Sequence, residues 1–504
     1  MGFVSLGCPK NLVDSEVMMG MLDHAGARLT AKPEEAEILV VNTCSFIDTA
    51  KQESVDTILE MARHKTEGRA RKLIVAGCLV ERYRDEIQKN IPEVDAVIGT
   101  GELDSILAAA GIAPTPAAPS PFTILRHDAP ADVRADVRAG REAESGTHRN
   151  LPAEMSFRPE GEHREQQGRF RRDAWHGAAH MLPTYLYDET TPRLLSTGQT
   201  SAYIKIAEGC DHPCSFCVIP NLRGKFRSRR FESVVAEAQQ LVARSVQEIT
   251  LIGQDTTCYG EDLGLKDGLA TLLDSLARID GLRWLRFLYA YPNRITGKLL
   301  ETIARHDNIC KYLDLPLQHA SPDVLKRMKR GAGAEIFLKT LDKVRAAVPG
   351  IVLRTSFIVG FPGESSQDFE ILEDFIAAAK FDWLGVFNYS DEEGSGAHTL
   401  DAKVPKRTIE ARKRHLMKLQ QDISKRVKQQ WVGREVLLLA EGPSEETELL
   451  WEGRTQFHAP EIDGKVYIND FGDLDALEAG RFYRAEITEA HDYDVVARVI
   501  SPAQ

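Results

Sequence analysis

The chain has 504 residues, 43% of them hydrophobic, and a formal net charge of −12 at neutral pH. At roughly 150 residues per domain, this length predicts three or four domains, each able to bury its own core. Eight cysteines are too few for a disulfide-rich secreted scaffold and favour a reducing, cytoplasmic location. No run approaches the roughly 18 apolar residues of a membrane span, and the first residues lack the basic region of a secretory signal.

Residues 1–112 alternate short apolar runs with amphipathic segments. Strands are predicted at 3–6, 38–41, 73–76 and 96–98, and helices near Asp14, Asp48 and Glu81. Strand followed by helix, repeated, predicts an open parallel α/β domain. Cys8, Cys44 and Cys78 each follow a predicted strand, and the carboxyl ends of parallel strands share one edge, where ligand sites lie. We therefore expect the three thiols to converge; the alternative is that each is a small buried hydrophobe.

Between residues 113 and 196 this alternation disappears. The segment is rich in proline, including a cluster at 114–121, and mixes arginine with glutamate without periodicity. Such a composition is typical of a flexible linker or insertion. Its arginines at 169, 171 and 172 could contact nucleic acid, but a solvated linker is the favoured interpretation.

Strand and helix alternation returns in residues 197–430 and repeats six times. Strands are predicted at 203–207, 248–252, 284–290, 312–315, 352–359 and 384–388, with helices near Glu232, Asp267, Thr296, Ala334 and Ser366. Six parallel units can curl into a partial (β/α)6 barrel, whose sites lie at the carboxyl ends of the strands. The lysine- and arginine-rich segment 405–430 predicts an exposed connecting helix.

A run of three cysteines, Cys210, Cys214 and Cys217, directly follows the first strand of this barrel. Three such thiolates can bind three irons of a 4Fe–4S cluster and leave the fourth iron open to a small molecule. Structural zinc needs four closed ligands, so a zinc site or a redox dithiol is the weaker alternative. The following strand ends carry polar, proline or glycine residues at 253–255, 291–293, 316–319 and 360–363, which would ring the same opening.

Residues 431–504 are predicted to form short strands, among them 435–440, 464–468 and 482–488, joined by acidic turns. This pattern favours a small antiparallel β-barrel. The segment holds 16 acidic and six basic residues, a net charge of −10 that is most of the chain's −12. Because nucleic-acid binding requires a basic face, nucleic acid is not favoured as a partner, whereas an acidic surface attracts basic proteins.

The cysteine run after the first strand of a six-fold barrel resembles that of the radical S-adenosylmethionine enzymes. In them S-adenosylmethionine binds the open iron, and one electron cleaves it to methionine and a 5'-deoxyadenosyl radical that abstracts hydrogen. The resemblance implies a cofactor role for Phe216, which precedes the last cysteine, and for Gly360, in a segment similar to the adenine-binding strand. Position alone adds Gln254 and Asp255 as candidate contacts to the cofactor or substrate.

The amino-terminal cysteines narrow this resemblance. Their surroundings, Leu6-Gly-Cys-Pro-Lys-Asn-Leu-Val-Asp-Ser-Glu16, Val41-Asn-Thr-Cys-Ser-Phe46 and Val75-Ala-Gly-Cys-Leu79, are similar to the amino-terminal domain of the methylthiotransferases. The last 74 residues resemble the TRAM domain of that family. The family resemblance implies a second 4Fe–4S cluster on Cys8, Cys44 and Cys78, which takes part in delivering the sulfur and methyl group.

Within the family, three segments look like the branch that acts on ribosomal protein S-twelve: 7–11, 251–257 and 459–464. That branch adds a methylthio group to the β-carbon of one aspartate of this basic protein, free or within the ribosome, and uses an electron donor. The alternative is the same chemistry on tRNA adenosine, whose enzymes usually begin with a Gly-Cys-Gln-Met-Asn motif. A third possibility is an acidic binding module with a structural metal and no catalysis.

Several other polar residues have weaker assignments. Cys258 stands where the branch commonly has arginine; it could line the barrel mouth, but an ordinary thiol is at least as plausible. His212 in the cysteine run is expected to orient the loop or to be solvated. Lys205, Arg354 and His319 are candidate contacts from position alone, and no side chain is assigned a catalytic role.

Overall fold

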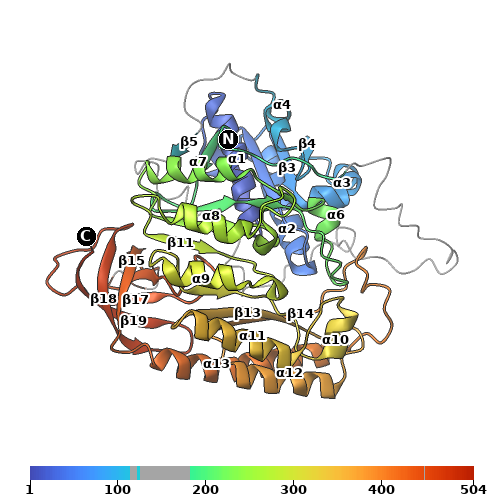
Figure 1. Ribbon diagram of the computed structural model, residues 1–504. Helices are drawn as coiled ribbons and strands as arrows, with labels where there is room; N and C mark the ends of the chain where they lie inside the picture. The colour runs from blue at the N-terminus through green and yellow to red at the C-terminus, as the bar shows by residue number, and fades with distance from the viewer. Residues whose placement is uncertain (114–121, 125–181, 446, 448, 504) are drawn as a thin grey trace.

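The computed structural model describes residues 1–113, 122–124, 182–445, 447 and 449–503. Within the expected flexible segment 113–196, residues 114–121 and 125–181, which include the arginines at 169, 171 and 172, lie outside the described residues. In Figure 1 an amino-terminal α/β domain lies above a curved array of strands and helices, and a small β-barrel lies beside that array. Among the described helices, none is long and apolar enough to cross a membrane.

The amino-terminal domain contains a four-stranded parallel sheet in the order β1-β2-β3-β4. Its elements are β1 (Gly2–Ser5), α1 (Pro9–His24), η1 (Pro33–Glu35), β2 (Ile38–Thr43), α2 (Asp48–Thr66), β3 (Lys72–Gly77), α3 (Cys78–Asn90), β4 (Ala96–Ile98), η2 (Leu103–Ser105) and α4 (Ile106–Ala110). The predicted open parallel α/β domain is confirmed. Helices α1 and α3 begin earlier than predicted, because Pro9 suits the first helical position and Gly77, with φ of +95°, turns the chain directly into α3.

Helix α1 forms the interface between this domain and the central barrel. Thirteen of its 16 residues are buried, so the helix is covered on all sides, as expected for a helix inside a larger core. It packs on the sheet with one face and on β6 (Arg193–Leu195) and β7 (Ser201–Lys205) with another. Gly20 permits this contact, since a Cβ there would lie 2.5 Å from the backbone of Arg193.

The end of the segment assigned to a linker is folded into this interface. Strand β6 pairs in parallel with β5 (Phe122–Ile124), and Tyr187 and Arg193 are buried. Arg193 Nε donates to Glu16 Oε2 at 3.0 Å and Arg193 Nη1 donates to Glu237 Oε1 at 2.7 Å. The composition of the segment gave no indication that its last residues pack in a domain interface, because the surrounding sequence is proline-rich and polar.

The central domain is a partial barrel of six parallel strands, as predicted. Two three-stranded sheets, β11-β10-β7 and β12-β13-β14, are joined by an isolated parallel bridge between Leu285 and Ile309. The strands after β7 are β10 (Glu248–Ile252), β11 (Trp284–Phe287), β12 (Tyr312–Asp314), β13 (Val352–Val359) and β14 (Trp383–Asn388). The outer helices are α7 (Phe231–Val242), α8 (Gly268–Leu276), α9 (Gly297–Arg305), α10 (Pro322–Arg327), α11 (Ala334–Ala347) and α12 (Ser366–Ala379). Shorter elements are β8 (Ala207–Glu208), α6 (Ile219–Arg223), β9 (Arg227–Ser228), η4 (Thr256–Cys258) and η5 (Pro292–Arg294).

Residues 406–429 form a helix, α13 (Lys406–Gln429), as predicted. The prediction that this helix is exposed is wrong for one of its faces, which is buried. The helix runs along the base of the molecule in Figure 1 and packs against β14 and α12. Ile409, Leu416 and Ile423 are buried in the core of the central barrel. The many lysines and arginines on the outer face masked this apolar stripe.

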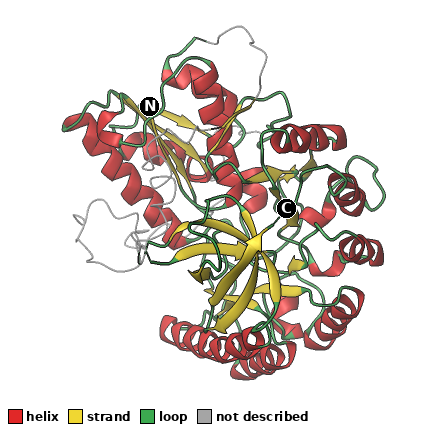
Figure 2. Cartoon of the chain, turned by 90° about the vertical axis from the view of Figure 1, so that its left-hand side faces the viewer, coloured by secondary structure: helices red, strands yellow, loops and turns green. Residues whose placement is uncertain are grey.

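The C-terminal domain is a closed five-stranded barrel in the order β15-β16-β17-β19-β18, seen in Figure 2. Its strands are β15 (Glu435–Pro443), β16 (Trp451–Thr455), β17 (Val466–Asp470), β18 (Phe482–Ala490) and β19 (Val495–Pro502). The predicted small β-barrel is confirmed with one departure: β17 and β19 pair in parallel, whereas the other four pairs are antiparallel.

This small barrel covers the amino-terminal end of the central barrel. The loop between β16 and β17 contacts residues near the beginnings of four central strands. Tyr203 Oη donates to Pro460 O (3.3 Å), Arg286 Nη1 to Gln456 O (2.9 Å), Tyr312 Oη to Asp463 Oδ2 (2.7 Å) and Trp383 Nε1 to Phe457 O (2.9 Å). We call residues 456–463 the plug loop. The carboxyl ends of the strands, where sites of such barrels lie, are on the opposite side.

Glu248, the first residue of β10, joins the two barrels through a buried ion pair. Its carboxylate accepts hydrogen bonds from Arg454 at 2.7 and 3.1 Å and from Ser201 Oγ at 2.6 Å. Burial opposes ionisation of this carboxyl, but Arg454, together with Arg286 and Ser201, outweighs it and lowers the pKa of Glu248 to about 2.

The lowered pKa of Glu248 predicts a pH-dependent contribution to stability. Its contribution of about 3 kcal/mol should be fully present above the unfolded value of 4.5 and be lost as pH falls toward 2. Urea unfolding of the wild type and Glu248→Gln measures this: the difference between their free energies of unfolding should shrink as the pH is lowered from neutral. A difference that does not change with pH would contradict the role given to Glu248.

Candidate active site

The three amino-terminal cysteines lie at the carboxyl ends of three neighbouring strands. Cys8 is the N-cap of α1 after β1, Cys44 follows β2, and Cys78 is the first residue of α3 after β3. Gly7 allows the first two loops to touch: a Cβ there would lie 3.0 Å from Cys44 Sγ, and its φ of +89° is rarely adopted by other residues. The sheet therefore brings together residues that are far apart in sequence, as the strand pattern predicted.

These three thiols act on one another electrostatically. Burial, together with Cys78 and Cys8, raises the pKa of Cys44 far above its usual value, and burial raises the pKa of Cys78 to about 11. Burial also opposes ionisation of Cys8, but Lys10 and Arg223 outweigh it and lower its pKa. Because iron binds thiolates, cluster binding would displace the remaining thiol protons. Three thiols in one pocket fit a 4Fe–4S cluster with one open iron.

The second triad lies in the loop between β8 and α6. Burial, assisted by the neighbouring thiols, raises the pKa of Cys210 to about 11 and that of Cys217 to about 12. Cys217 Sγ accepts a hydrogen bond from Ile219 N at 3.4 Å, and Arg330 Nη1 lies 3.6 Å from Cys214 Sγ. Hydrogen bonds and a positive charge of this kind tune iron–sulfur clusters, so this donor set fits the same group.

The loop that carries this second triad is fixed at its centre. Ser215 N donates to Met328 O at 3.1 Å, Ser215 O accepts from Ala397 N at 2.6 Å, and Ser215 Oγ donates to Arg327 O at 2.8 Å. The neighbouring Phe216 packs against an apolar cluster formed around α10. Its aromatic ring therefore helps to anchor the loop.

The other three residues expected to contact the cofactor also lie at carboxyl ends of strands. Gln254 and Asp255 follow β10, and Gly360 follows β13. Gln254 Nε2 donates to Glu208 at 2.6 Å, while Gln254 Oε1 is buried without a hydrogen-bond partner among the described residues. A buried acceptor of this kind is one that a ligand could satisfy. At Gly360, φ is +79° and a Cβ would lie 2.3 Å from Ile409, so a side chain would not fit.

A group of buried charges, of which the sequence singled out only Lys205, lies between the two triads. Arg223 Nη1 donates to Asp14 Oδ2 at 2.6 Å and to Glu208 Oε2 at 3.3 Å. Lys205 Nζ donates to Glu208 Oε2 at 2.5 Å and also to Asp14, and Arg223 Nη2 donates to Asn11. The four charged side chains are at most 4% exposed. We call these five residues the interface network.

Arg223 connects this network to the amino-terminal pocket. Although burial opposes its charge, Cys78, Glu208 and Asp14 hold the pKa of Arg223 well above its usual value. On the other side, Glu208 binds Gln254 at the end of β10. The network therefore bridges the surroundings of the two triads. The polar residues of α1 were visible in the sequence, but nothing in it indicated that a second domain would bury them.

Three residues suggested by strand position alone have other partners. Lys205 belongs to the interface network. Arg354 Nη1 donates to Asp314 Oδ1 at 2.8 Å and Arg354 Nε lies 3.3 Å from Asp463 Oδ1 of the plug loop. His319 is fully buried, its Nδ1 accepts from Ser321 N at 3.0 Å, and burial lowers its pKa to about 3. Lys205 and Arg354 are therefore better explained by packing and domain docking than by ligand contact, whereas Nε2 of His319 is buried without a hydrogen-bond partner among the described residues.

Family models match three parts of the chain. "Uncharacterized protein family UPF0004" matches residues 1–99, "Radical SAM superfamily" matches residues 204–376 and "TRAM domain" matches residues 432–500. These matches fall on the amino-terminal sheet domain, the central barrel and the small C-terminal barrel.

Curated proteins are similar over almost the whole chain. The "Ribosomal protein uS12 methylthiotransferase RimO" of Koribacter versatilis is 65% identical over 500 residues, which cover 99% of this chain and 96% of that protein. The protein of the same name from Solibacter usitatus is 54% identical, covering 100% and 95%. That from Myxococcus xanthus is 42% identical, covering 99% and 91%. Among solved structures, the radical S-adenosylmethionine methyltransferase TsrM from Kitasatospora setae superimposes with a TM-score of 0.48 at 16% identity, over 77% of this chain and 71% of that chain.

Proposed function

Since this chain belongs to the family of ribosomal protein uS12 methylthiotransferases, we propose that it adds a methylthio group to the β-carbon of an aspartate in ribosomal protein uS12. It is a radical S-adenosylmethionine enzyme that uses 4Fe–4S clusters and S-adenosylmethionine. One observation carries the proposal: two groups of three cysteines lie next to the interface network, with Cys78 packed against Val218 beside Cys217. Radical generation and sulfur delivery would then each have a site of their own.

We assign the two pockets different tasks. Cys210, Cys214 and Cys217 would hold the cluster that binds S-adenosylmethionine, whereas Cys8, Cys44 and Cys78 would hold the second cluster. Bound at the first pocket, the cluster and cofactor supply the electron transfer and hydrogen abstraction, and the protein supplies position and exclusion of water.

Four residues are proposed to line the cofactor pocket: Phe216, Gln254, Asp255 and Gly360. Phe216 holds the cysteine loop in place, and the free Oε1 of Gln254 offers a buried acceptor. Gly360 keeps the end of β13 clear of a side chain. Asp255 is already held by His212, Cys258 and Thr257, which outweigh the effect of burial and lower the pKa of Asp255. Its carboxylate therefore stays charged at neutral pH.

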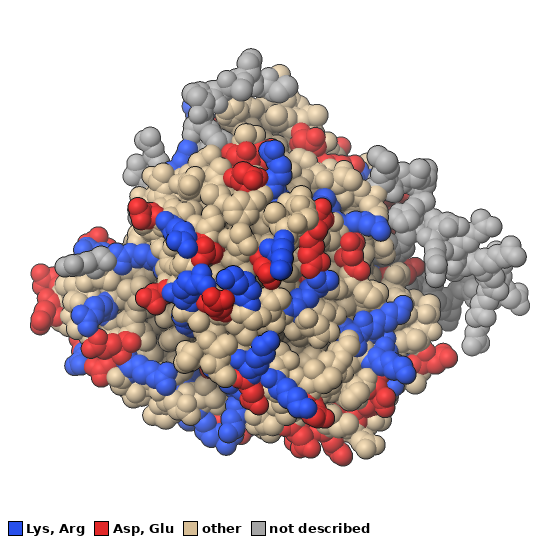
Figure 3. All heavy atoms as spheres, in the orientation of Figure 1, with Lys and Arg blue, Asp and Glu red and all other residues tan. Residues whose placement is uncertain are grey.

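The charge of the C-terminal barrel supports a basic protein partner. Residues 470–478, from the last residue of β17 into the loop before β18, contain four exposed acidic side chains and no lysine or arginine: Asp470, Asp473, Asp475 and Glu478. Figure 3 shows both signs of charge interspersed over the visible face, with Asp and Glu at the outer edge of this barrel on the left. Opposite charges can accelerate association roughly 10- to 1,000-fold at low salt. A ribosomal substrate and a reducible cluster further imply a cytoplasmic location and an electron donor.

Mass spectrometry of ribosomal protein uS12 and of total tRNA from a strain that lacks this chain tests the function. The uS12 peptide should lose its methylthio mass, and the tRNA nucleosides should be unchanged. Complementation with the wild-type chain should restore the modification, whereas Cys214→Ala should not. Loss of methylthio adenosine from tRNA with uS12 still modified would instead support the tRNA function.

A further inference from the structure

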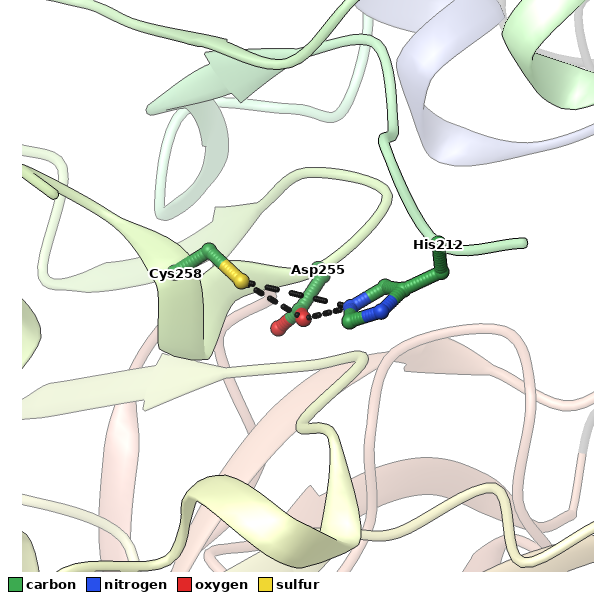
Figure 4. A group of neighbouring side chains, drawn as sticks. All are labelled: His212, Asp255 and Cys258. Atoms are coloured by element: carbon green, nitrogen blue, oxygen red, sulfur yellow. Dashed lines mark hydrogen bonds and ion pairs between the residues drawn. The ribbon is translucent and has the colours of Figure 1, made fainter. Parts of the chain in front are cut away.

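Three potential metal ligands lie beside the second triad but belong to neither cysteine pocket. His212 Nε2 is 2.6 Å from Asp255 Oδ2, and Cys258 Sγ is 2.9 Å from the same oxygen. The sulfur and the ring nitrogen are 4.0 Å apart. In Figure 4 the three side chains converge from the cysteine loop and from the turn after β10. Their ligand atoms all lie within 4.8 Å of one another.

This set of donors suits a zinc-like cation. Imidazole, carboxylate and thiolate are the three ligand types that zinc uses in proteins, at bond lengths of about 2.0–2.3 Å. Tetrahedral ligands at such bond lengths are roughly 3–4 Å apart. The two distances to Asp255 Oδ2 would therefore have to lengthen by roughly 0.5 Å, whereas the sulfur and the ring nitrogen are already that far apart. A carboxylate and a thiolate would together neutralise a divalent charge in a buried place. Three protein ligands leave one tetrahedral position for water or a small molecule.

Neighbouring groups already orient these ligands. Asp255 Oδ1 accepts hydrogen bonds from Thr257 N at 2.8 Å and from Thr257 Oγ1 at 2.5 Å, which leaves Oδ2 for the group of three. The ring of His212 stacks on Tyr291 with a centroid distance of 4.0 Å and an interplanar angle of 9°. Tyr291 N in turn donates to Thr257 Oγ1 at 3.2 Å. Support of this kind around the ligands is characteristic of metal sites.

We propose that His212, Asp255 and Cys258 bind one divalent cation of the zinc class. The ion would tie the cysteine loop to the turn after β10 at the mouth of the central barrel. This site is additional to the two clusters; it shares Asp255 with the residues proposed to line the cofactor pocket. The thiol and the imidazole contact the same carboxylate oxygen.

The metal content of the full-length protein tests this site. Protein with both clusters reconstituted anaerobically is incubated with one equivalent of zinc and desalted, and its zinc and iron are then measured by mass spectrometry. The wild type should retain about one zinc beside roughly eight irons. Cys258→Ala should bind zinc at least roughly tenfold more weakly with its iron unchanged. Cys310→Ala, a control at another buried cysteine outside both triads, should retain both metals.

X-ray absorption at the zinc edge distinguishes this site from zinc lodged in a cysteine pocket. One sulfur at about 2.3 Å with nitrogen or oxygen at about 2.0–2.1 Å is expected. A shell of three sulfurs, zinc retained by Cys258→Ala, or no zinc in fully iron-loaded wild type would overturn the proposal. Since these measurements do not involve methylthio transfer, such a result would leave the proposed activity untouched.

Discussion

Cys44→Ala is expected to abolish methylthio transfer while radical generation continues. The substitution removes one ligand from the amino-terminal pocket, whereas the loop around Ser215 that holds the second triad stays anchored. The variant should therefore hold about four irons instead of about eight. It should still form 5'-deoxyadenosine from S-adenosylmethionine and dithionite, but methylthiolation of uS12 should fall at least roughly 1,000-fold. Iron analysis, chromatography of the nucleoside and mass spectrometry of uS12 measure the three quantities.

Two further variants make this result specific. Cys214→Ala, in the other pocket, should lose both 5'-deoxyadenosine formation and methylthio transfer. Cys310→Ala, buried but outside both triads, should retain both. If Cys44→Ala transferred the methylthio group at the wild-type rate, the assignment of a second cluster to the amino-terminal pocket would be wrong.

Arg223→Met should lower the free energy of unfolding by about 3–5 kcal/mol. The guanidinium is buried and binds Asp14, Glu208 and Asn11, so its removal leaves two buried carboxylates with only Lys205 to balance them. The loss is large because the charges cannot reach water. Urea unfolding of the reduced, metal-free protein measures the change.

An exposed arginine provides the control for this measurement. Arg278 pairs with Asp274 at 3.0 Å, but its side chain is 66% exposed, so Arg278→Met should change the free energy of unfolding by less than about 1 kcal/mol. Arg223→Lys should recover part of the lost stability. Lysine restores the positive charge, but it lacks the second nitrogen with which the guanidinium binds another partner. Equal effects of Arg223→Met and Arg278→Met would show that the interface network does not support the domain contact.

The cysteine pockets could be anticipated from the sequence, whereas the contacts between domains could not. Cys8, Cys44 and Cys78 follow strands whose apolar pattern is clear, and a parallel sheet then places them at one edge. The burial of Asp14 has no such local signal, because it depends on β7 and α6 of another domain. Likewise, Ile409 and Leu416 were hidden in a helix rich in lysine and arginine.

Position along a strand explains why Arg354 was misassigned. It is the third residue of the eight-residue strand β13 and therefore lies near the amino end, where the plug loop binds it through Asp463. Gly360 lies just beyond the opposite end of the same strand. A strand thus carries docking residues at its beginning and candidate ligand residues at its end, a distinction that sequence periodicity does not make.

The plug loop also determines which end of the central barrel is open to cofactor and substrate. Its hydrogen bonds to Tyr203, Arg286, Tyr312 and Trp383 cover the amino end, so cofactor, products and a loop of the protein substrate must share the carboxyl side. A substrate loop seated there would keep methionine and 5'-deoxyadenosine from leaving. We therefore expect the modified protein to dissociate before the spent cofactor is exchanged.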